Sequence, residues 1–284
     1  MMEGEDWPSA EAAEPVPSWP PDRWISPSAL KSYNNCPYRV RLQYLDQVPK
    51  PPVFNLFLTM GNIAHQLLAQ SATLISRGQS VLPQETLFEM AFRRLPPWQF
   101  HSEVAREGHT RDIVRWVLYG ISHLDRDAQY LKIERMGHRE LAWQPEGMRL
   151  TVVTKPDLVL LRTDHNGEQF VEIIDYKTGT RRIDEIPPVV MRYVLKDLFR
   201  TIAPDPSTLR MTFTYLWLDF GTLDQIPLTL EYSTAAWDDV VLNIGRLMAE
   251  REWSAQPSYL CNFCPYNGDP CTAFTEMKHD LEPF

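Results

Sequence analysis

FVEIIDYK, residues 170–177, is an apolar and β-branched run that ends in an aspartate and a lysine. Such residues favour strands, and a run that is apolar on both alternating faces is typical of a strand buried in a sheet. Side chains two positions apart on a strand share a face, so Asp175 and Lys177 point the same way. Charged residues at the end of a buried strand usually have a partner or a function, because an unpaired buried charge is costly in free energy. This end of the strand is therefore the first candidate site.

The patterns on either side of this strand predict a mixed fold. Helical spacing of apolar residues dominates from about residue 24 to residue 124, including a helix over about 56–75. Short strand-forming runs separated by turn residues then predict a meander, and it is followed by further helices and strands. The predicted strands are 140–143, 150–153, 158–161, 170–176, 211–218 and 226–232, and the later helices are 188–202 and 233–253. We therefore expect an α+β domain with a small mixed sheet flanked by helices.

Composition excludes several classes of protein. The chain has 284 residues, of which 44% are hydrophobic, enough to form a core. It lacks a run of about 18 apolar residues and a basic, apolar leader, so we expect a cytoplasmic protein with no membrane partner. Neither G-x-x-x-x-G-K-[ST] nor G-x-G-x-x-G occurs, so the sequence gives no support for a nucleotide motor or a dinucleotide enzyme.

The charge of −9 is unevenly distributed. Residues 1–22 contain six acids, five prolines and no base, a composition that predicts a flexible leader. Residues 272–284 contain three acids and one base, which leaves about −1 for the body of the chain. A nucleic-acid partner is therefore not excluded by the overall charge, although phosphates favour lysine and arginine.

A second pair of charged residues precedes the central strand. Lys155-Pro156-Asp157 ends one predicted hairpin strand or begins the next, and a neighbouring strand can place Asp157 beside Asp175 and Lys177. Two carboxylates suit Mg²⁺ or Mn²⁺, and a lysine beside them can position a water or stabilise its deprotonated form, as phosphodiester hydrolysis requires. The alternative is that Asp157 lies in a turn while Asp175 and Lys177 form a surface ion pair of little consequence.

The four cysteines form the second candidate site. Cys261, Cys264 and Cys271 lie within eleven residues near the C-terminus, and Cys36 lies far upstream. Three thiolates in a proline-containing loop suit a metal centre, and a fourth from the first helix would complete it. Spacing alone leaves a zinc site and an iron-sulfur cluster open, and four unrelated buried cysteines are the remaining alternative.

Taken in order, these residues resemble a known set of motifs. Cys36-Pro37 follows a capped first helix, Gly61-x3-His65 lies on the next helix, and Pro156-Asp157, residues 175–179 (DYKTG) and the cysteine triplet follow. The chain resembles the RecB-like branch of the PD-(D/E)XK nucleases, specifically the iron-sulfur members of CRISPR adaptation and of AddAB-type helicase-nucleases. The resemblance covers about residues 24–275.

The resemblance implies roles for individual residues. It makes His65, Asp157 and Asp175 ligands of Mg²⁺ or Mn²⁺ and Lys177 the catalytic lysine. It places Tyr193 at the tyrosine of the family's Q-x-x-x-Y motif, where this chain has Val189 instead of the glutamine. It also implies an acid before the Asp157 hairpin, for which Glu140 is the candidate, and makes the four cysteines ligands of a [4Fe-4S] cluster: Cys36, Cys261, Cys264 and Cys271.

The resemblance also implies a domain plan. It predicts a restriction-endonuclease-like core over residues 23–275, between the leader at 1–22 and a tail at 276–284. A helical insertion occupies 83–130, and a cluster loop at 261–271 closes with Cys36 as an iron-sulfur staple.

The expected function is metal-dependent cleavage of DNA, on single strands or ends and as an exonuclease rather than an endonuclease. The resemblance places it in DNA repair, recombination or CRISPR adaptation, with a helicase or a CRISPR adaptation protein as a possible partner. Two alternatives stay open. One is a catalytically silent nuclease fold that binds DNA or protein, and the other is a zinc-stapled structural protein.

Overall fold

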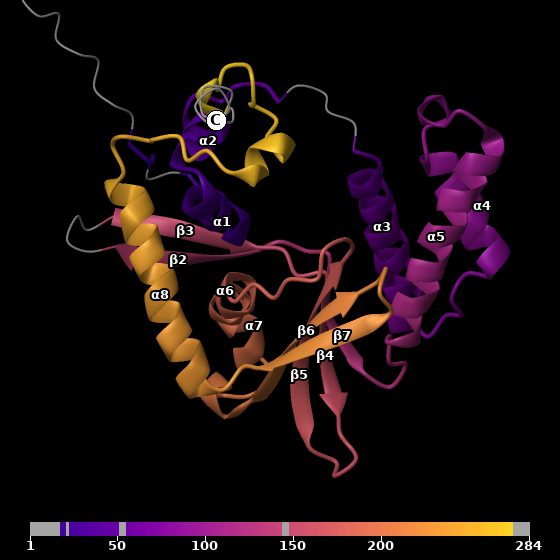
Figure 1. Ribbon diagram of the computed structural model, residues 1–284. Coiled ribbons are helices and arrows are strands. Elements are labelled where there is room, and N and C mark those ends of the chain that lie inside the picture. Colours follow the sequence, from indigo (N-terminus) through magenta and orange to yellow (C-terminus); the bar gives the residue numbers. More distant parts are fainter. Residues whose placement is uncertain (1–17, 21–22, 51–54, 144–147, 275–284) are drawn as a thin grey trace, which may run out of the picture.

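The computed structural model describes residues 18–20, 23–50, 55–143 and 148–274. A five-stranded sheet lies between helices on both faces, and a separate two-stranded sheet packs with the short first helix and the long last helix (Figure 1). The predicted α+β class with a small mixed sheet is confirmed. Within the described residues, no helix is long and apolar enough to cross a membrane.

Most helices precede the strands in the chain, and the others lie between two strands or follow the last one. The helical elements are α1 (Pro27–Asn35), α2 (Pro37–Val40), η1 (Arg41–Leu45), α3 (Leu56–Ser76), α4 (Gln84–Arg94), η2 (Pro97–Gln99), α5 (Glu103–Ser122), α6 (Ile186–Val194), α7 (Lys196–Arg200), η3 (Pro206–Thr208), α8 (Leu230–Ala249) and η4 (Tyr259–Phe263). The strands are β1 (Gln129–Ile133), β2 (Gly137–Trp143), β3 (Met148–Thr154), β4 (Leu158–Thr163), β5 (Gln169–Lys177), β6 (Arg210–Trp217) and β7 (Thr222–Pro227).

The main sheet has the order β1-β4-β5-β6-β7. Its strands pair antiparallel, except for β5 and β6, which are parallel and are joined by α6 and α7. A parallel pair needs such a crossover, because a tight turn can join only antiparallel neighbours. Strand β5 is buried over residues 171–176, as its apolar run predicts.

The two faces of the sheet bury alternate residues of the same strands. Ile174 and Tyr176 of β5 pack with α3, α4 and α5, whereas Ile173 packs with α6 and α7. A third cluster joins α1, α6 and α8 to β3, and a parallel bridge between Ile25 and Val152 connects the start of the chain to β3. The N-terminal and C-terminal segments therefore share one core.

Several sequence expectations are corrected by the structure. Strand β1 begins within the expected helical insertion. The sequence does not predict this strand, because its five residues are too few for a clear period. The prediction of one continuous meander is wrong, since β2 and β3 form a sheet of their own. The expected helix at 188–202 is two helices, and 230–232 begins α8 rather than ending a strand.

The boundary of the expected leader also moves. Trp19 is buried and its ring packs against Tyr44 at a centroid distance of 5.5 Å, so the ordered core extends into the segment assigned to the leader. Composition missed this because one aromatic anchor carries the contact. Residues 1–17 and the expected tail at 276–284 lie outside the described residues.

Candidate active site

Three acidic residues stand side by side at one end of the main sheet. Glu134 directly follows β1, Asp157 directly precedes β4, and Asp175 lies near the end of β5. Leu158, the first residue of β4, pairs with the last residue of β1 and with the residue before Asp175. The next position along each strand therefore brings the three acids opposite one another. The Glu134 backbone N–H donates to the Asp157 carbonyl oxygen at 2.9 Å, which fixes this register at the site itself.

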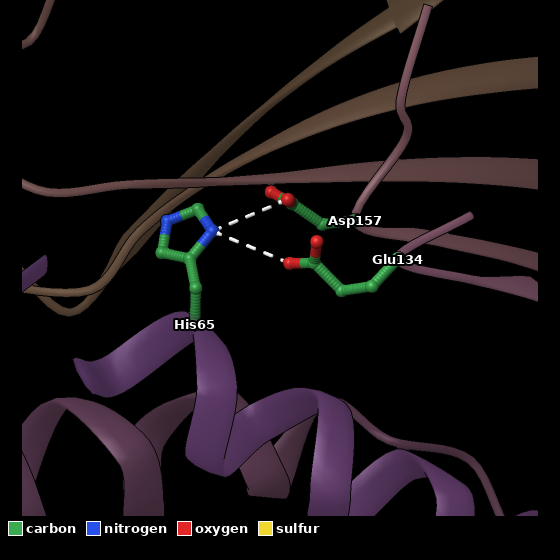
Figure 2. Close-up of side chains that lie close together, drawn as sticks. All are labelled: His65, Glu134 and Asp157. Carbon is green, nitrogen blue, oxygen red and sulfur yellow. Dashed lines mark hydrogen bonds and ion pairs between the residues drawn. The ribbon is translucent and has the colours of Figure 1, made fainter. Parts of the chain in front are cut away.

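His65 reaches the row of acids from helix α3 (Figure 2). Its Nδ1 atom lies 3.2 Å from Asp157 Oδ1 and 3.7 Å from Glu134 Oε1. Its ring meets Tyr176 edge-on, at a centroid distance of 5.7 Å, which limits how the imidazole can turn. His65, Glu134 and Asp157 each offer a ligand atom within 4.8 Å of the other two. One nitrogen and two carboxylates in this arrangement can bind a divalent cation.

Backbone and charge hold the two carboxylates in place. Asp157 is buried, and its Oδ2 atom accepts a hydrogen bond from the Tyr176 backbone N–H at 2.6 Å. Glu134 adopts φ 46°, a left-handed conformation that costs a residue with a Cβ roughly 1–2 kcal/mol. Its Oε2 atom is paired with the ammonium group of Lys155, from the β3–β4 connection. The glutamate thus bridges His65 on one side and a lysine on the other.

Asp175 and Lys177 form the second part of the site. Their side chains share a face of β5, as the sequence predicts, and Lys177 Nζ lies 2.7 Å from Asp175 Oδ2. Asp175 is buried, whereas the Lys177 side chain remains 39% exposed, so the charged end of the lysine can meet a substrate. The Lys177 Nζ atom also lies 5.7 Å from the ring centre of Tyr215 on β6.

The pKa values of the site reflect this crowding of charge. Burial acts to lower the pKa of His65, but hydrogen bonds with Asp157 and Glu134 outweigh it and raise the pKa to about 10. Burial raises the pKa of Asp157. For Glu134, burial is outweighed by His65 and Lys155, which hold its pKa below the usual range. For Lys177, burial is outweighed by Asp175, and its pKa is raised. The site without a metal therefore holds protons that a cation can replace.

A comparison with protein families now identifies the fold. The model of the PD-(D/E)XK nuclease superfamily matches residues 24–268. The chain belongs to the PD-(D/E)XK nuclease superfamily. A search of curated proteins gave no significant match.

Two solved structures are similar to this nuclease-superfamily chain at low identity. The crystal structure of SSO0001 is 16% identical, covers 89% of this chain and 87% of its own, and gives a TM-score of 0.38. A candidate exonuclease from Eubacterium rectale is 13% identical, covers 92% and 94%, and gives a TM-score of 0.47. The assignment to the superfamily therefore rests on the family model and on the fold.

The residues of this PD-(D/E)XK site fit the divalent metal that such nucleases use. The three ligands that converge are a histidine and two carboxylates, with Asp175 next in the row. Mg²⁺ and Mn²⁺ accept oxygen ligands readily, and Mn²⁺ also accepts imidazole nitrogen. The donor set therefore suits the ion on its chemistry as well as on its geometry.

The sequence missed Glu134 and proposed an acid at a different place. Glu140 lies on β2 in the two-stranded sheet, where it is exposed and pairs with Arg149 at 3.0 Å. Glu134 takes the position beside His65 instead. The available signal is an acid directly after the short run Gln129–Ile133, but this run is not among the predicted strands. Without β1, nothing in the sequence places residue 134 opposite Asp157.

Tyr193 lies apart from the row of acids. Its ring stacks on Trp237 of α8 at a centroid distance of 3.8 Å, and the guanidinium group of Arg139 lies over it at 4.8 Å. Val189, one turn earlier on α6, is buried in the same core cluster. The structure thus separates Tyr193 from His65 and Asp157, and its role in the reaction stays a prediction.

The four cysteines line one pocket between α1 and the C-terminal turns. The thiols are Cys36, Cys261, Cys264 and Cys271. Burial, and to a smaller degree the other three cysteines, raise the pKa of the Cys271 thiol. Backbone N–H groups of Gln256 and Ser258 point at the sulfur atoms of Cys36 and Cys261, at 3.5 and 3.4 Å. Within the described residues, no three of these sulfur atoms lie within 4.8 Å of one another.

Proposed function

We propose that this protein is a metal-dependent deoxyribonuclease that hydrolyses phosphodiester bonds of single-stranded DNA or of DNA ends. The observation that carries the proposal is the convergence of His65, Glu134 and Asp157 beside the Asp175–Lys177 pair. A divalent cation held there supplies an acidified water and charge stabilisation at phosphorus. Exonuclease rather than endonuclease action, and a role in repair, recombination or CRISPR adaptation, are part of the proposal and rest on the resemblance of the motifs.

In this proposal, metal binding and activation of the attacking water are carried out by different residues. His65, Glu134 and Asp157 hold the ion, with Asp175 as the further carboxylate. Lys177, oriented by Asp175, positions the attacking water and stabilises its negative charge through its ammonium group. This division predicts that carboxylate variants lose both metal and activity, whereas a lysine variant loses activity alone.

The direct test is cleavage of end-labelled DNA. Purified protein is incubated with single-stranded or duplex oligonucleotides in Mn²⁺, Mg²⁺ or EDTA. We expect cleavage that starts at ends, prefers single strands and stops in EDTA. Binding without cleavage under all conditions would favour the catalytically silent module. Internal cuts in circular single strands would contradict the exonuclease assignment.

We further propose that the four cysteines bind a [4Fe-4S] cluster. Four thiols lining one pocket support the proposal, as do the backbone N–H groups directed at Cys36 and Cys261. Tetrahedral zinc, with Zn–S bonds of about 2.3 Å, would need sulfur atoms about 3.8 Å apart. Among the described residues no three of these sulfur atoms lie within 4.8 Å of one another, which favours the larger cluster over a single ion. Anaerobically purified protein should be brown and contain iron, and a colourless zinc protein would contradict this.

A further inference from the structure

Three polar side chains beside the metal site are not used by the proposed reaction. The site opens into a pocket whose walls are α3, the end of β1 and the β3–β4 connection. In addition to the ligands His65, Glu134 and Asp157, this pocket is lined by three polar residues: Asn62, Gln66 and Lys155. They border the place where the substrate must lie.

Asn62 and Gln66 form a polar edge on helix α3. They are four residues apart and flank His65 in sequence, so all three side chains lie on one side of the helix. Both amides are exposed, and in the described part of the chain neither has a hydrogen-bond or ion-pair partner. An amide is both a donor and an acceptor, which is the chemistry that reads the edge of a nucleobase.

Lys155 supplies a cation at the opposite wall. Its side chain is 54% exposed, and its ammonium group pairs with Glu134 Oε2. Once Glu134 serves as a metal ligand, the ion offsets the charge of the glutamate and Lys155 can pair with a phosphate. Several other basic side chains pair with acids away from this pocket. Lys31 Nζ, for example, lies 2.8 Å from Asp184 Oδ2.

We propose that Asn62, Gln66 and Lys155 form a subsite for the nucleotide next to the cleaved bond. This inference rests on the proposed nuclease function. Lys155 binds the neighbouring phosphate, and the two amides bind the edge of the unpaired base. Unpaired bases expose these edges, so the subsite favours single strands over duplex.

The first experiment measures binding and is independent of cleavage. A fluorescent single-stranded oligonucleotide is titrated with protein carrying Lys177→Ala, in Mn²⁺ and over a range of salt concentrations. Adding Lys155→Met should weaken binding about tenfold, as loss of a charged hydrogen bond does. The slope of log K against log salt should fall by about 0.7, the value for one phosphate contact on a single strand. Lys196→Met, an exposed lysine of α7 outside this pocket, is the matched control and should change neither quantity.

The second experiment separates the amides from the helix that carries them. Gln66→Ala and Asn62→Ala should each raise KM for single-stranded DNA about fivefold while kcat changes less than twofold, because they bind substrate without touching the reacting atoms. Gln70→Ala is the control, since Gln70 is exposed on the same helix but outside the pocket. It should leave both constants unchanged.

The outcomes distinguish the subsite from the nuclease proposal. Equal KM values for Gln66→Ala and Gln70→Ala, with an unchanged salt slope in Lys155→Met, would overturn the subsite while wild-type cleavage stands. A weaker Mn²⁺ affinity in Lys155→Met with an unchanged salt slope would also overturn it, because the lysine would then serve only Glu134. A reduced slope in a protein that never cuts DNA would support the subsite and refute the nuclease.

Discussion

The row of acids and the cysteine pocket position their candidate ligands by different means. At the row, Glu134, Asp157 and Asp175 stand on three strands whose hydrogen bonds fix the register, and the two aspartates are buried. At the pocket, the cysteines lie at the end of α1 and on short turns after α8, and all four are partly exposed. One site is assembled by the sheet, whereas the other joins the two ends of the chain.

Because of this difference, substitutions at the row of acids should affect activity, whereas substitutions at the cysteine pocket should affect stability. A ligand at the end of a buried strand can be removed while the sheet keeps its core, because apolar packing holds the strand. A ligand on a short turn contributes its binding free energy directly to the folding of that turn. Variants in the row of acids should therefore lose activity and keep their fold, whereas variants at the cysteine pocket should lose stability.

The largest effect is expected at the row of acids. Asp157→Ala and Asp175→Ala should abolish cleavage and weaken Mn²⁺ binding, because each removes a carboxylate. Lys177→Ala should lower cleavage by a factor on the order of 10² to 10⁴ while Mn²⁺ binding is kept. All three should fold cooperatively with their iron, which single-turnover assays, titration calorimetry and metal analysis can check. Wild-type cleavage by Asp175→Ala and Lys177→Ala would refute the assignment of the site.

The next effect is expected at the cysteine pocket. Cys36→Ala and Cys261→Ala should lose iron and lower the free energy of unfolding by several kcal/mol, because the metal-ligand bonds connect the chain ends. Iron content and denaturant unfolding measure both consequences. Equal iron and equal stability in the two variants would show that the pocket holds no cluster, and the contrast between the sites would disappear.

A packing contact offers a third test on the side of the row. A Cβ added at Gly61 of α3 would lie 2.7 Å from Thr178 Oγ1, directly after Lys177. Gly61→Ala should therefore shift α3, and with it His65, and lower cleavage about tenfold, since small displacements of reacting groups are costly.

Two variants control this packing test. Adding Thr178→Ala should restore cleavage, because the nearest remaining atom, the Thr178 Cβ, lies at 3.8 Å. Gly108→Ala, on α5 with open space around its Cβ, should leave activity unchanged. Failure of the double variant to recover would show that the glycine acts in another way.

The pH dependence of metal binding gives a fourth test. The pKa of His65 is raised to about 10 without metal, and a histidine ligand must be neutral. Mn²⁺ binding near pH 7 should therefore release about one proton from His65, and affinity should fall about tenfold per unit as pH decreases. In the metal-free protein the same pairing stabilises the fold fully below about pH 6.5 and is lost as pH rises through about 10. Calorimetry in buffers of different ionisation enthalpy measures the proton release, and His65→Ala should lack it.

The smallest effect concerns the turn that leads to the cysteines. Glu250 Oε1 accepts backbone N–H groups from Arg251, Glu252 and Trp253, and Oε2 accepts from the Tyr33 hydroxyl at 2.9 Å. Burial acts to raise the pKa of Glu250, but these hydrogen bonds outweigh it and the pKa is lowered.

This depressed pKa predicts a pH window. The contribution to stability should be present above about pH 4.5 and lost as pH falls below it. Glu250→Gln should cost about 1 kcal/mol at pH 7 and much less at pH 3, as measured by urea unfolding. An equal cost at both values would show that the charge is unimportant.

Part of the site could be predicted because its signals are local. The apolar run before Asp175, the alternation that places Lys177 on the same face, and the helix that carries His65 all follow from periods of two and 3.6 residues. Glu134 was missed because a five-residue strand has too few positions to show its period. Its backbone conformation is equally invisible in the sequence.

Three features follow from the amino-acid sequence alone: the α+β class, the strand that ends in Asp175 and Lys177, and the grouping of three cysteines in one short segment. Three others appear only in the folded chain: which acid faces His65, the stacking of Tyr193 on Trp237, and the place of Trp19 in the core. The two groups differ in how far along the chain the responsible interactions reach. Periodicity and turn chemistry act over a few residues, whereas strand register and core packing bring together positions that no local pattern connects.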